Sequence, residues 1–486
     1  MSAGLLESPL SADGPTPAAP SSPGGWPDYR AVWRWHFYAG LFSMPFVVIL
    51  SISGALYLFK TEIEAWNDRP YDGLTVAGTP ASAEAQVRAA VAAFPGSVPT
   101  GYEVPQESGS SARVMLRSEG ETLRVYVHPE TCAVLHSVRE NDRLMRQLFR
   151  LHGELWMGDR GSNLVELAAS WTIVMIVTGL YLWWPRNVRG LGGVLYPRLR
   201  KGSSIFWRDL HSVVGIWVSG LALFLLVSGL PWARFWGTYF KTARQWTGTA
   251  VAQQDWTVGS DRSAAPSRGD SGGGGEHAGH GGGGGGRGRR GGGAMPKDLG
   301  GFDRVLAAVL PLGLPHPVVI APPALATGTD WTAKSMTPNR PLRVNLVVNG
   351  TTGEIVSRED FGDRHLVDRV VGYGIAAHEG RLFGWPNQLL GLMTAAGLVL
   401  LSVSGWILWW RRRDAGVLGA PRVLRGPQFS LGLLLCIGLL AIFLPLFGGS
   451  LLLVFLLERG LLCRLPRVRP WLGLRPPAGV AEVLPV

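Results

Sequence analysis

Five long uncharged stretches divide the chain, and apolar side chains dominate each of them. They lie at Trp35–Phe59, Leu167–Trp184, Leu210–Ala233, Leu382–Trp410 and Gly426–Leu457. A helix of about 20 apolar residues crosses the roughly 30 Å hydrocarbon core of a bilayer. The hydrophobic pattern therefore predicts five membrane crossings in place of one soluble domain.

The long connections between these stretches have a different pattern. Ser82–Phe94 is typical of a capped amphipathic helix, and Asp303–Leu310 is its counterpart later in the chain. Val127-x3-Thr131-Cys132-x-Val134 matches Val348-x3-Thr352-Gly353-x-Ile355, which indicates a strand, a turn and a second strand in each connection. We expect a small α+β domain in each.

The membrane stretches repeat in pairs. A histidine is followed by Gly four residues on and by Ser-Gly 17 and 18 residues on in two places, at His36, Gly40, Ser53 and Gly54 and at His211, Gly215, Ser228 and Gly229. The second stretch of each pair holds Thr178-Gly179 or Ser404-Gly405 and then a Trp pair that begins 31 residues after His152 or His378. Both units start on one side, so they are parallel repeats about an axis along the membrane normal.

The predicted fold is an α-helical transmembrane bundle of four core helices in two parallel repeats, with a C-terminal hydrophobic segment and two extracytoplasmic α+β domains. Its expected boundaries are a disordered cytoplasmic tail at 1–30, TM1 at 31–60, domain 1 at 61–163, TM2 at 164–185, a cytoplasmic loop at 186–208, TM3 at 209–235, domain 2 at 236–381 with an insert at 269–293, TM4 at 382–410, TM5 or a re-entrant pair at 426–457, and a basic tail at 458–486.

Charge sets the expected orientation. Only 17% of residues are charged, below the roughly 25% of ordinary globular proteins. The connection Pro185–Arg208 contains Lys and Arg but no Asp or Glu, and Arg411–Arg413 follow the fourth stretch directly. Both of these basic segments are therefore expected in the cytoplasm. The net charge of +11 is thus interpreted as membrane orientation, and no nucleic-acid partner is expected. Whether the fifth stretch crosses once or turns back at Pro445 stays open.

The three cysteines lie in separate regions and form neither a disulfide framework nor a zinc motif. Covalent c-type haem is excluded because the chain has no CxxCH sequence. Met1–Gly25 lacks Lys, Arg and an apolar core, so it is interpreted as a disordered tail and not as a signal peptide.

These features together resemble a known family. The segments that carry the resemblance are "WRWHFYAG", "RVYVHPETCAVL", "RLHGELWMGDRGSNLVELAASWTIVMIVTGLYLWWPR", "FWRDLHSVVGIWVSGL", "VNLVVNGTTGEIV" and "AAHEGRLFGWPNQLLGLMTAAGLVLLSVSGWILWWRRR". They resemble the PepSY-associated transmembrane proteins of the iron-regulated inner-membrane kind, over nearly everything from about 30 to 415. The resemblance implies non-covalent b-type haem and reduction of ferric siderophores at the periplasmic face. Cys132 departs from the pattern, because the family usually has Gly in that turn.

Four histidines occupy equivalent places in the repeat and are the candidate haem ligands. His36 and His211, the inner pair, begin the first and third stretches, and His152 and His378, the outer pair, precede the second and fourth. Two-fold pseudosymmetry would set the members of each pair opposite one another around one of two haems.

Small residues are the second part of this hypothesis. Gly40 and Gly215 lie one turn beyond a histidine and would leave room for a flat macrocycle, and Gly54 and Gly229 lie five turns on, near the level of the outer haem. The alternative is that each histidine is interfacial and each glycine serves helix packing. Propionates would need cations, and the candidates are Arg34, Arg186, Arg208 and Arg411 inside and Arg146 and Arg150 outside.

The other histidines carry weaker hypotheses. His128, His136, His316 and His365 are interpreted as structural or solvated. The glycine-rich insert includes Glu276, His277 and His280, which could bind Cu or Zn weakly at most, because a Gly-rich tether is not preorganised.

The expected function is electron transfer across a bacterial inner membrane by a membrane oxidoreductase. A cytoplasmic-side donor or quinol would reduce the inner haem, and the outer haem would reduce a ferric siderophore or similar chelate. No nucleotide-binding GxGxxG sequence is visible, so the donor would be a separate molecule. The rival hypothesis is a non-redox membrane anchor whose PepSY domains bind or regulate a peptidase or cell-envelope partner; it leaves the four histidines unexplained.

Overall fold

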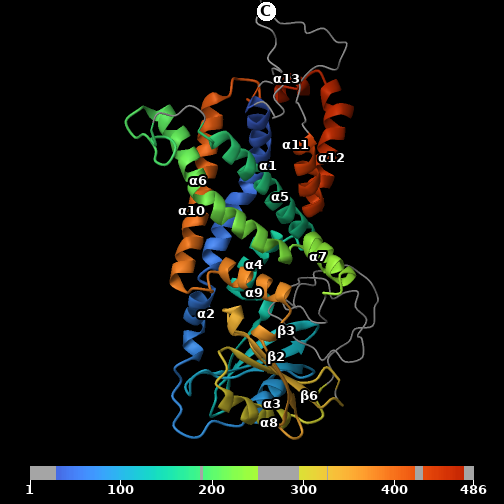
Figure 1. Cartoon of the computed structure of the whole chain (residues 1–486). Helices are drawn as coiled ribbons and strands as arrows, with labels where there is room; N and C mark the ends of the chain where they lie inside the picture. The colour runs from blue at the N-terminus through green and yellow to red at the C-terminus, as the bar shows by residue number, and fades with distance from the viewer. Residues whose placement is uncertain (1–28, 186–189, 250–294, 326, 422–430, 475–486) are drawn as a thin grey trace, which may run out of the picture.

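A bundle of long helices stands on one eight-stranded sheet in the computed structural model (Figure 1), which describes residues 29–185, 190–249, 295–325, 327–421 and 431–474. The predicted N-terminal tail up to residue 28 and the glycine-rich insert lie outside the described residues. The core helices are α1 (Tyr29–Tyr57), α5 (Asp159–Trp183), α6 (Ser203–Gly229) and α10 (Trp385–Arg412). Helix α1 packs on α5 and α10, and α6 packs on α10 and α5.

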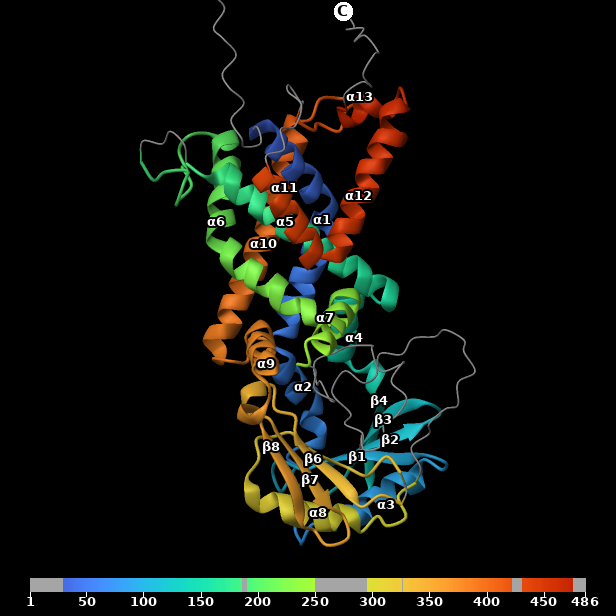
Figure 2. The same ribbon diagram turned by 45° about the vertical axis from the view of Figure 1, so that its right-hand side comes forward.

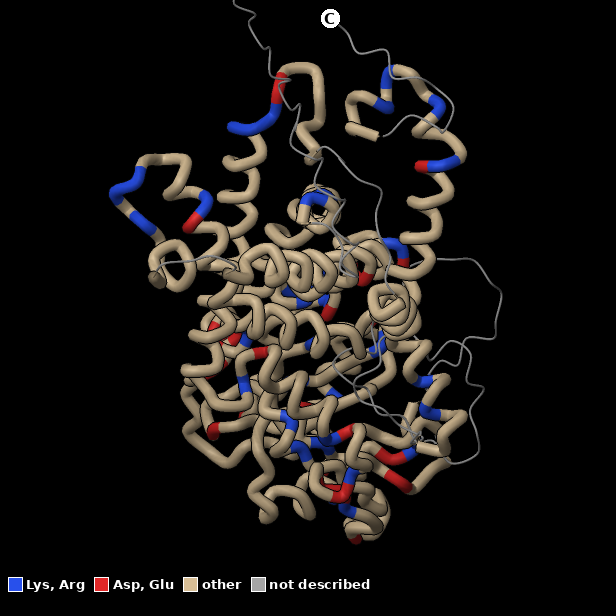
Figure 3. Tube along the Cα trace, turned by 45° about the horizontal axis from the view of Figure 1, so that its top comes forward, with Lys and Arg blue, Asp and Glu red and all other residues tan. Residues whose placement is uncertain are grey.

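Five helices among the described residues are long and apolar enough to cross a membrane, so the chain is a multi-pass membrane protein. Figure 3 shows long uncharged runs in these helices. Three of them start earlier than their apolar stretches, α1 at Tyr29, α5 at Asp159 and α6 at Ser203. Charged residues end an apolar run in the sequence, but they do not interrupt backbone hydrogen bonds, so the helix continues past the apolar boundary.

The fifth apolar stretch forms two helices, α11 (Leu431–Phe443) and α12 (Pro445–Gly460), which lie side by side (Figures 1 and 2). Proline has no N–H to continue a helix and is accommodated at the start of the next one. The short α13 (Val468–Leu472) then returns to the start of α1, where Tyr38 Oη donates to Leu472 O over 2.6 Å.

Shorter helices connect the bundle to the sheet. Helix α4 (Leu144–Glu154) packs on α1, and α9 (Leu366–His378) packs on α6. We call α1, α4 and α5 the first helix unit and α6, α9 and α10 the second. Helix α2 (Lys60–Asp68) continues from α1 toward the sheet, and α7 (Arg234–Trp246) lies against α5.

The sheet has the strand order β4-β3-β2-β1-β5-β6-β7-β8, and its paired strands are antiparallel. The strands are β1 (Val98–Glu103), β2 (Ala112–Ser118), β3 (Glu121–Val127), β4 (Val134–Arg139), β5 (Val318–Ala321), β6 (Asp330–Ser335), β7 (Val344–Asn349) and β8 (Ile355–Asp360). The sequence predicts two α+β domains, and in the structure the strands of both regions form one sheet, joined where Tyr102 pairs with Ile320. Helices α3 (Ala83–Ala93) and α8 (Gly301–Val309) pack against this sheet and share one apolar core with it.

The predicted strand-turn-strand segments are confirmed in both halves. Val127 pairs with Val134 and Val348 pairs with Ile355 at the same irregularity in each hairpin. The turn residue is left-handed in both, with φ 77° at Gly353 and φ 57° at Cys132. Ser82 also accepts a hydrogen bond from the backbone N–H of Ala85, as expected for the cap of α3.

Candidate functional site

The two histidines of the inner pair face each other between the helix units. His36 on α1 and His211 on α6 have ring centres 6.4 Å apart, and their planes are almost perpendicular at 83°. Both lie near the start of their helices, at the end of the bundle away from the sheet. Residues from the two halves of the sequence therefore meet at one point.

The outer pair lies toward the sheet. His152 is in the last turn of α4 and His378 ends α9. Burial lowers the pKa of each imidazole to about 4, and the neighbouring imidazole of His152 contributes to the lowering at His378. Trp232 packs edge-on against His378 with ring centres 5.6 Å apart. The outer imidazoles are thus neutral at pH 7, which is the form that binds a metal.

Each inner imidazole is held through Nδ1 by a helix of its own unit. His36 Nδ1 lies 2.9 Å from Met175 O and 3.2 Å from Thr178 Oγ1 on α5. His211 Nδ1 lies 3.2 Å from Leu401 O and 3.0 Å from Ser404 Oγ on α10.

The outer imidazoles are held in the same way, again within their own units. His152 Nδ1 is 3.0 Å from Ser53 Oγ on α1, and His378 Nδ1 is 3.0 Å from Ser228 Oγ on α6. Among the described residues, no hydrogen bond uses Nε2 of any of the four histidines.

A glycine follows each of these hydroxyl residues and lies against the Cε1 edge of the imidazole. A Cβ at Gly54 would come within 2.9 Å of His152 Cε1, and one at Gly179 within 3.0 Å of His36 Cε1. The corresponding distances at Gly229 and Gly405, to His378 and His211, are both 3.4 Å.

The other two predicted glycines have different neighbours. A Cβ at Gly40 would meet Met175 Sδ at 3.5 Å, and one at Gly215 would meet Leu401 Cδ2 at 3.7 Å, which are ordinary packing distances. The structure therefore sets Gly54 and Gly229 directly against imidazoles, and Gly40 and Gly215 against apolar side chains of the same unit. A place for Gly40 and Gly215 beside a macrocycle stays a prediction.

The separation of the inner imidazoles is compatible with both of them binding one metal ion. With metal–nitrogen bonds of about 2 Å, imidazoles on opposite sides of one metal have ring centres about 6 Å apart. The separation of 6.4 Å meets this requirement. No cluster of three or more His, Cys, Asp or Glu side chains suited to a metal ion occurs among the described residues.

Most of the arginines considered for propionates have protein partners. Arg34 donates to the backbone carbonyls of Pro421, Leu472 and Gly473, so it ties the C-terminal segment to α1. Arg208 pairs with Asp209 at 3.0 Å, and Arg411 donates to Ser203 Oγ.

Two of the remaining three arginines lie within the described residues. On the outer side, Arg146 lies over the ring of Phe149, and Arg150 is 3.9 Å from Glu154. The sixth, Arg186, lies outside the described residues.

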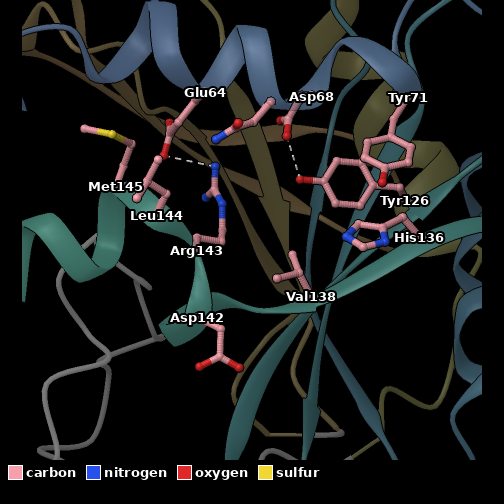
Figure 4. A pocket seen from close by; sticks show the side chains of 11 residues that line it. Glu64, Asp68, Tyr71, Tyr126, His136, Val138, Asp142, Arg143, Leu144 and Met145 are labelled. Carbon is pink, nitrogen blue, oxygen red and sulfur yellow. Dashed lines mark hydrogen bonds and ion pairs between the residues drawn. The ribbon is translucent and has the colours of Figure 1, made fainter.

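A pocket of about 220 Å³ opens between α2, the strands β3 and β4, and the start of α4 (Figure 4). Its aromatic side is formed by Tyr71, Tyr126 and His136, and the rings of Tyr71 and His136 stack with centres 4.9 Å apart. Helix α4 runs from this pocket to His152, eight residues or about 12 Å beyond Leu144.

Carboxylates outnumber guanidinium groups around the pocket. Three arginines, Arg113, Arg124 and Arg143, form ion pairs with five acids: Glu64, Asp68, Asp72, Glu103 and Glu140. Glu64 and Asp68 line the pocket itself, together with Asp142. Among the charged residues that line the pocket there are thus three carboxylates and one guanidinium group, that of Arg143.

Sequence reasoning missed the role of Thr178, Ser404, Gly179 and Gly405. It identified the dipeptides as part of the repeat but assigned them no contact with a histidine. The recurrence of Ser/Thr-Gly once for each of the four histidines was the available signal.

The helix bundle and the joined sheet define a multi-pass membrane protein that also carries a β-sheet. The chain matches the PepSY-associated TM region over residues 33–412 and belongs to that family. A comparison with curated proteins gives no match. The matched range includes both helix units and the sheet, whereas α11, α12 and α13 lie beyond it.

Proposed function

We propose that this protein transfers electrons across the bacterial inner membrane through two non-covalent b-type haems and reduces ferric siderophores or similar chelates on the periplasmic face. The observation that carries the proposal is the inner pair, in which His36 and His211 from separate units face each other at 6.4 Å. Haem, when bound, supplies a one-electron carrier at each level.

The four histidines have a defined task in this proposal. Each pair would hold the iron of one haem with two imidazoles, and such ligation would leave no coordination position open for oxygen or substrate. Such ligation favours electron transfer over oxygen chemistry. Gly54 lies 18 residues after His36 on α1, so the two levels are about 27 Å apart along the helix and both faces of the membrane are within reach.

The donor and the acceptor lie on opposite faces in this proposal. The basic residues Arg198, Arg208 and Arg411 at the end away from the sheet support a cytoplasmic inner pair by the positive-inside rule. A quinol or a cytoplasmic protein gives one electron for each Fe(III) reduced to Fe(II). Reduction weakens the chelate, because Fe(II) is a poorer partner for hard oxygen ligands.

The pocket beside α4 offers the acceptor a place near the outer pair. Its excess of carboxylates favours chelates that carry a cationic group, and Tyr71 and His136 offer flat surfaces for packing. The acceptor would then lie at one end of α4 with His152 at the other.

An absorption spectrum of the purified protein tests the proposal. We expect a b-type spectrum with close to two haems per chain, extractable by acid solvent because no CxxCH sequence attaches them. Protein purified without haem from haem-replete cells would overturn the redox function and favour the membrane anchor that binds a peptidase or cell-envelope partner.

A further inference from the structure

Each of the four imidazoles contacts a Ser/Thr-Gly dipeptide of its own unit, and the hydroxyl of that dipeptide also hydrogen-bonds to a carbonyl of its own helix. A hydroxyl has one proton to donate. Ser53 Oγ donates to Ile49 O over 2.8 Å, Ser228 Oγ to Phe224 O over 2.7 Å, and Thr178 Oγ1 to Val174 O over 2.8 Å. Ser404 Oγ donates to Leu401 O over 3.0 Å.

Because each hydroxyl proton is committed to a carbonyl of its own helix, the hydroxyl oxygen can only accept from the imidazole. The other contacts of the inner Nδ1 atoms are carbonyl oxygens, Met175 O for His36 and Leu401 O for His211, and these also accept only. Nδ1 therefore carries the proton in each ring. A neutral imidazole has one protonated nitrogen, so Nε2 keeps its lone pair in all four histidines.

We propose that Thr178, Ser404, Ser53 and Ser228 are positioning residues that hold His36, His211, His152 and His378, respectively, as the Nδ1–H tautomer and strengthen Nε2 as a ligand. The proposal rests on the proposed function, because the ligand strength acts on haem iron. A hydrogen bond accepted from Nδ1–H moves electron density onto the ring and raises its basicity. A more basic ligand favours Fe(III) over Fe(II), so the hydroxyl lowers the midpoint potential of the haem.

The glycine of each dipeptide leaves room for the imidazole beside the helix. It lets the Cε1 edge of the ring approach the helix closely enough for Nδ1 to reach the preceding hydroxyl. The position that a Cβ would take lies only 2.9 Å from the ring at Gly54 and 3.0 Å at Gly179. The two residues of the dipeptide therefore act together, one by hydrogen bonding and the other by leaving space.

Redox titration of the purified holoprotein followed by absorbance tests this inference. Ser404→Ala should raise the midpoint potential of one haem and leave the other unchanged. Loss of such a partner changes metal affinity on the order of tenfold, and a tenfold change in the ratio of ferric to ferrous affinity corresponds to about 59 mV for one electron. The effect is partial, because Leu401 O remains as an acceptor.

Two further variants separate hydrogen bonding from packing. Ser402→Ala on the same helix removes a hydroxyl that donates to Leu398 O, and Ser402 has no hydrogen bond to an imidazole, so both potentials should stay at their wild-type values. Ser404→Thr keeps a hydroxyl where the other unit naturally has Thr178 and should also keep the wild-type potential.

The outcomes distinguish this inference from the function on which it rests. Wild-type protein without haem refutes the proposed function. Two haems whose potentials do not differ between Ser404→Ala and Ser402→Ala refute the positioning role and leave electron transfer standing. Equal loss of one haem in Ser404→Ala and Ser404→Thr shows that the position serves packing and also refutes the inference.

Discussion

The glycines beside the histidines are the residues with the least room for change. A Cβ at Gly54 or Gly179 comes within 3.0 Å of an imidazole, whereas the distance at Gly229 and Gly405 is 3.4 Å. We expect Gly54→Ala to lose the outer haem and Gly179→Ala to lose the inner haem, with smaller losses for Gly229→Ala and Gly405→Ala. Haem content per chain measures this.

Gly40→Ala is the matched control for these substitutions. Its new methyl group would meet Met175 Sδ at an ordinary 3.5 Å, so haem content should remain close to wild type. Loss of haem in Gly40→Ala with retention in Gly54→Ala would contradict the assignment of glycine roles.

The backbone of Cys132 has a left-handed conformation, which costs conformational free energy. Its φ of 57° is unfavourable for a residue with a Cβ, and the equivalent turn in the second half has Gly353. Cys132→Gly should therefore stabilise the sheet by about 1 kcal/mol. An increase in the apparent unfolding temperature checks this, and a decrease would show that the thiol makes a contact worth more than the strain.

The repeat marks the four histidines as candidate ligands and places Gly54 and Gly229 near the level of the outer pair. It did not predict the contact between Ser53-Gly54 and His152, since 99 residues separate Ser53 from His152. Spacing along one helix shows which residues share a face, but it does not show which helix packs there. The hydroxyl role of Ser53 thus became visible only when α4 was placed on α1.

At the scale of elements, an ion-pair network holds β2 and β3 to the helices next to the membrane. Arg124 on β3 pairs with Glu103 at 2.8 Å and with Glu140 at 3.0 Å. Burial alone would raise the pKa of Glu140, but Arg124 and Arg143 lower it to about 2. The native carboxylate is thus more acidic than an unfolded Glu, whose pKa is about 4.3.

This pKa difference predicts how stability depends on pH. Because the native pKa is the lower one, the stabilising contribution of Glu140 is complete above about pH 4.3 and is lost as the pH falls toward 2. Glu140→Gln should lower the free energy of unfolding at pH 7 by roughly 2 kcal/mol, which is measured as a lower apparent unfolding temperature. The difference in unfolding temperature from wild type should shrink near pH 3. A difference that stays constant with pH would show that Glu140 acts through packing.

The α11–α12 pair makes a prediction about topology. Helix α13 returns to Arg34 and Tyr38 at the start of α1, so Cys463 and Cys132, in the turn between β3 and β4, should lie on opposite sides of the membrane. In sealed, oriented vesicles of a Cys436→Ala variant, an impermeant thiol reagent should label only one of these two cysteines from each side. Labelling of both from the same side would mean that residues 431–460 cross the membrane once.

At the scale of the whole molecule, the pseudosymmetry that the repeat predicts for the helices stays a prediction, and the repeat did not predict the joined sheet. The strands within each half pair with near neighbours in the sequence, which alternation and turn residues can indicate. The junction between β1 and β5 pairs Tyr102 with Ile320 across more than 200 residues, and nothing in either strand specifies that partner. Likewise, apolar length predicted the fifth stretch, while its reversal at Pro445 depends on packing against α5.

The central claim is that residues from both units bind each haem, and haem content in paired histidine variants tests it most directly. His36→Ala and His211→Ala, alone or combined, should remove the same single haem. Once one ligand is lost the haem no longer binds, so removing the second ligand has no further effect. His152→Ala and His378→Ala should likewise remove the other haem, and a double variant across the pairs, such as His36→Ala with His152→Ala, should remove both. If that cross-pair variant kept one haem while His36→Ala with His211→Ala lost both, each haem would be bound within one unit and this account would be wrong.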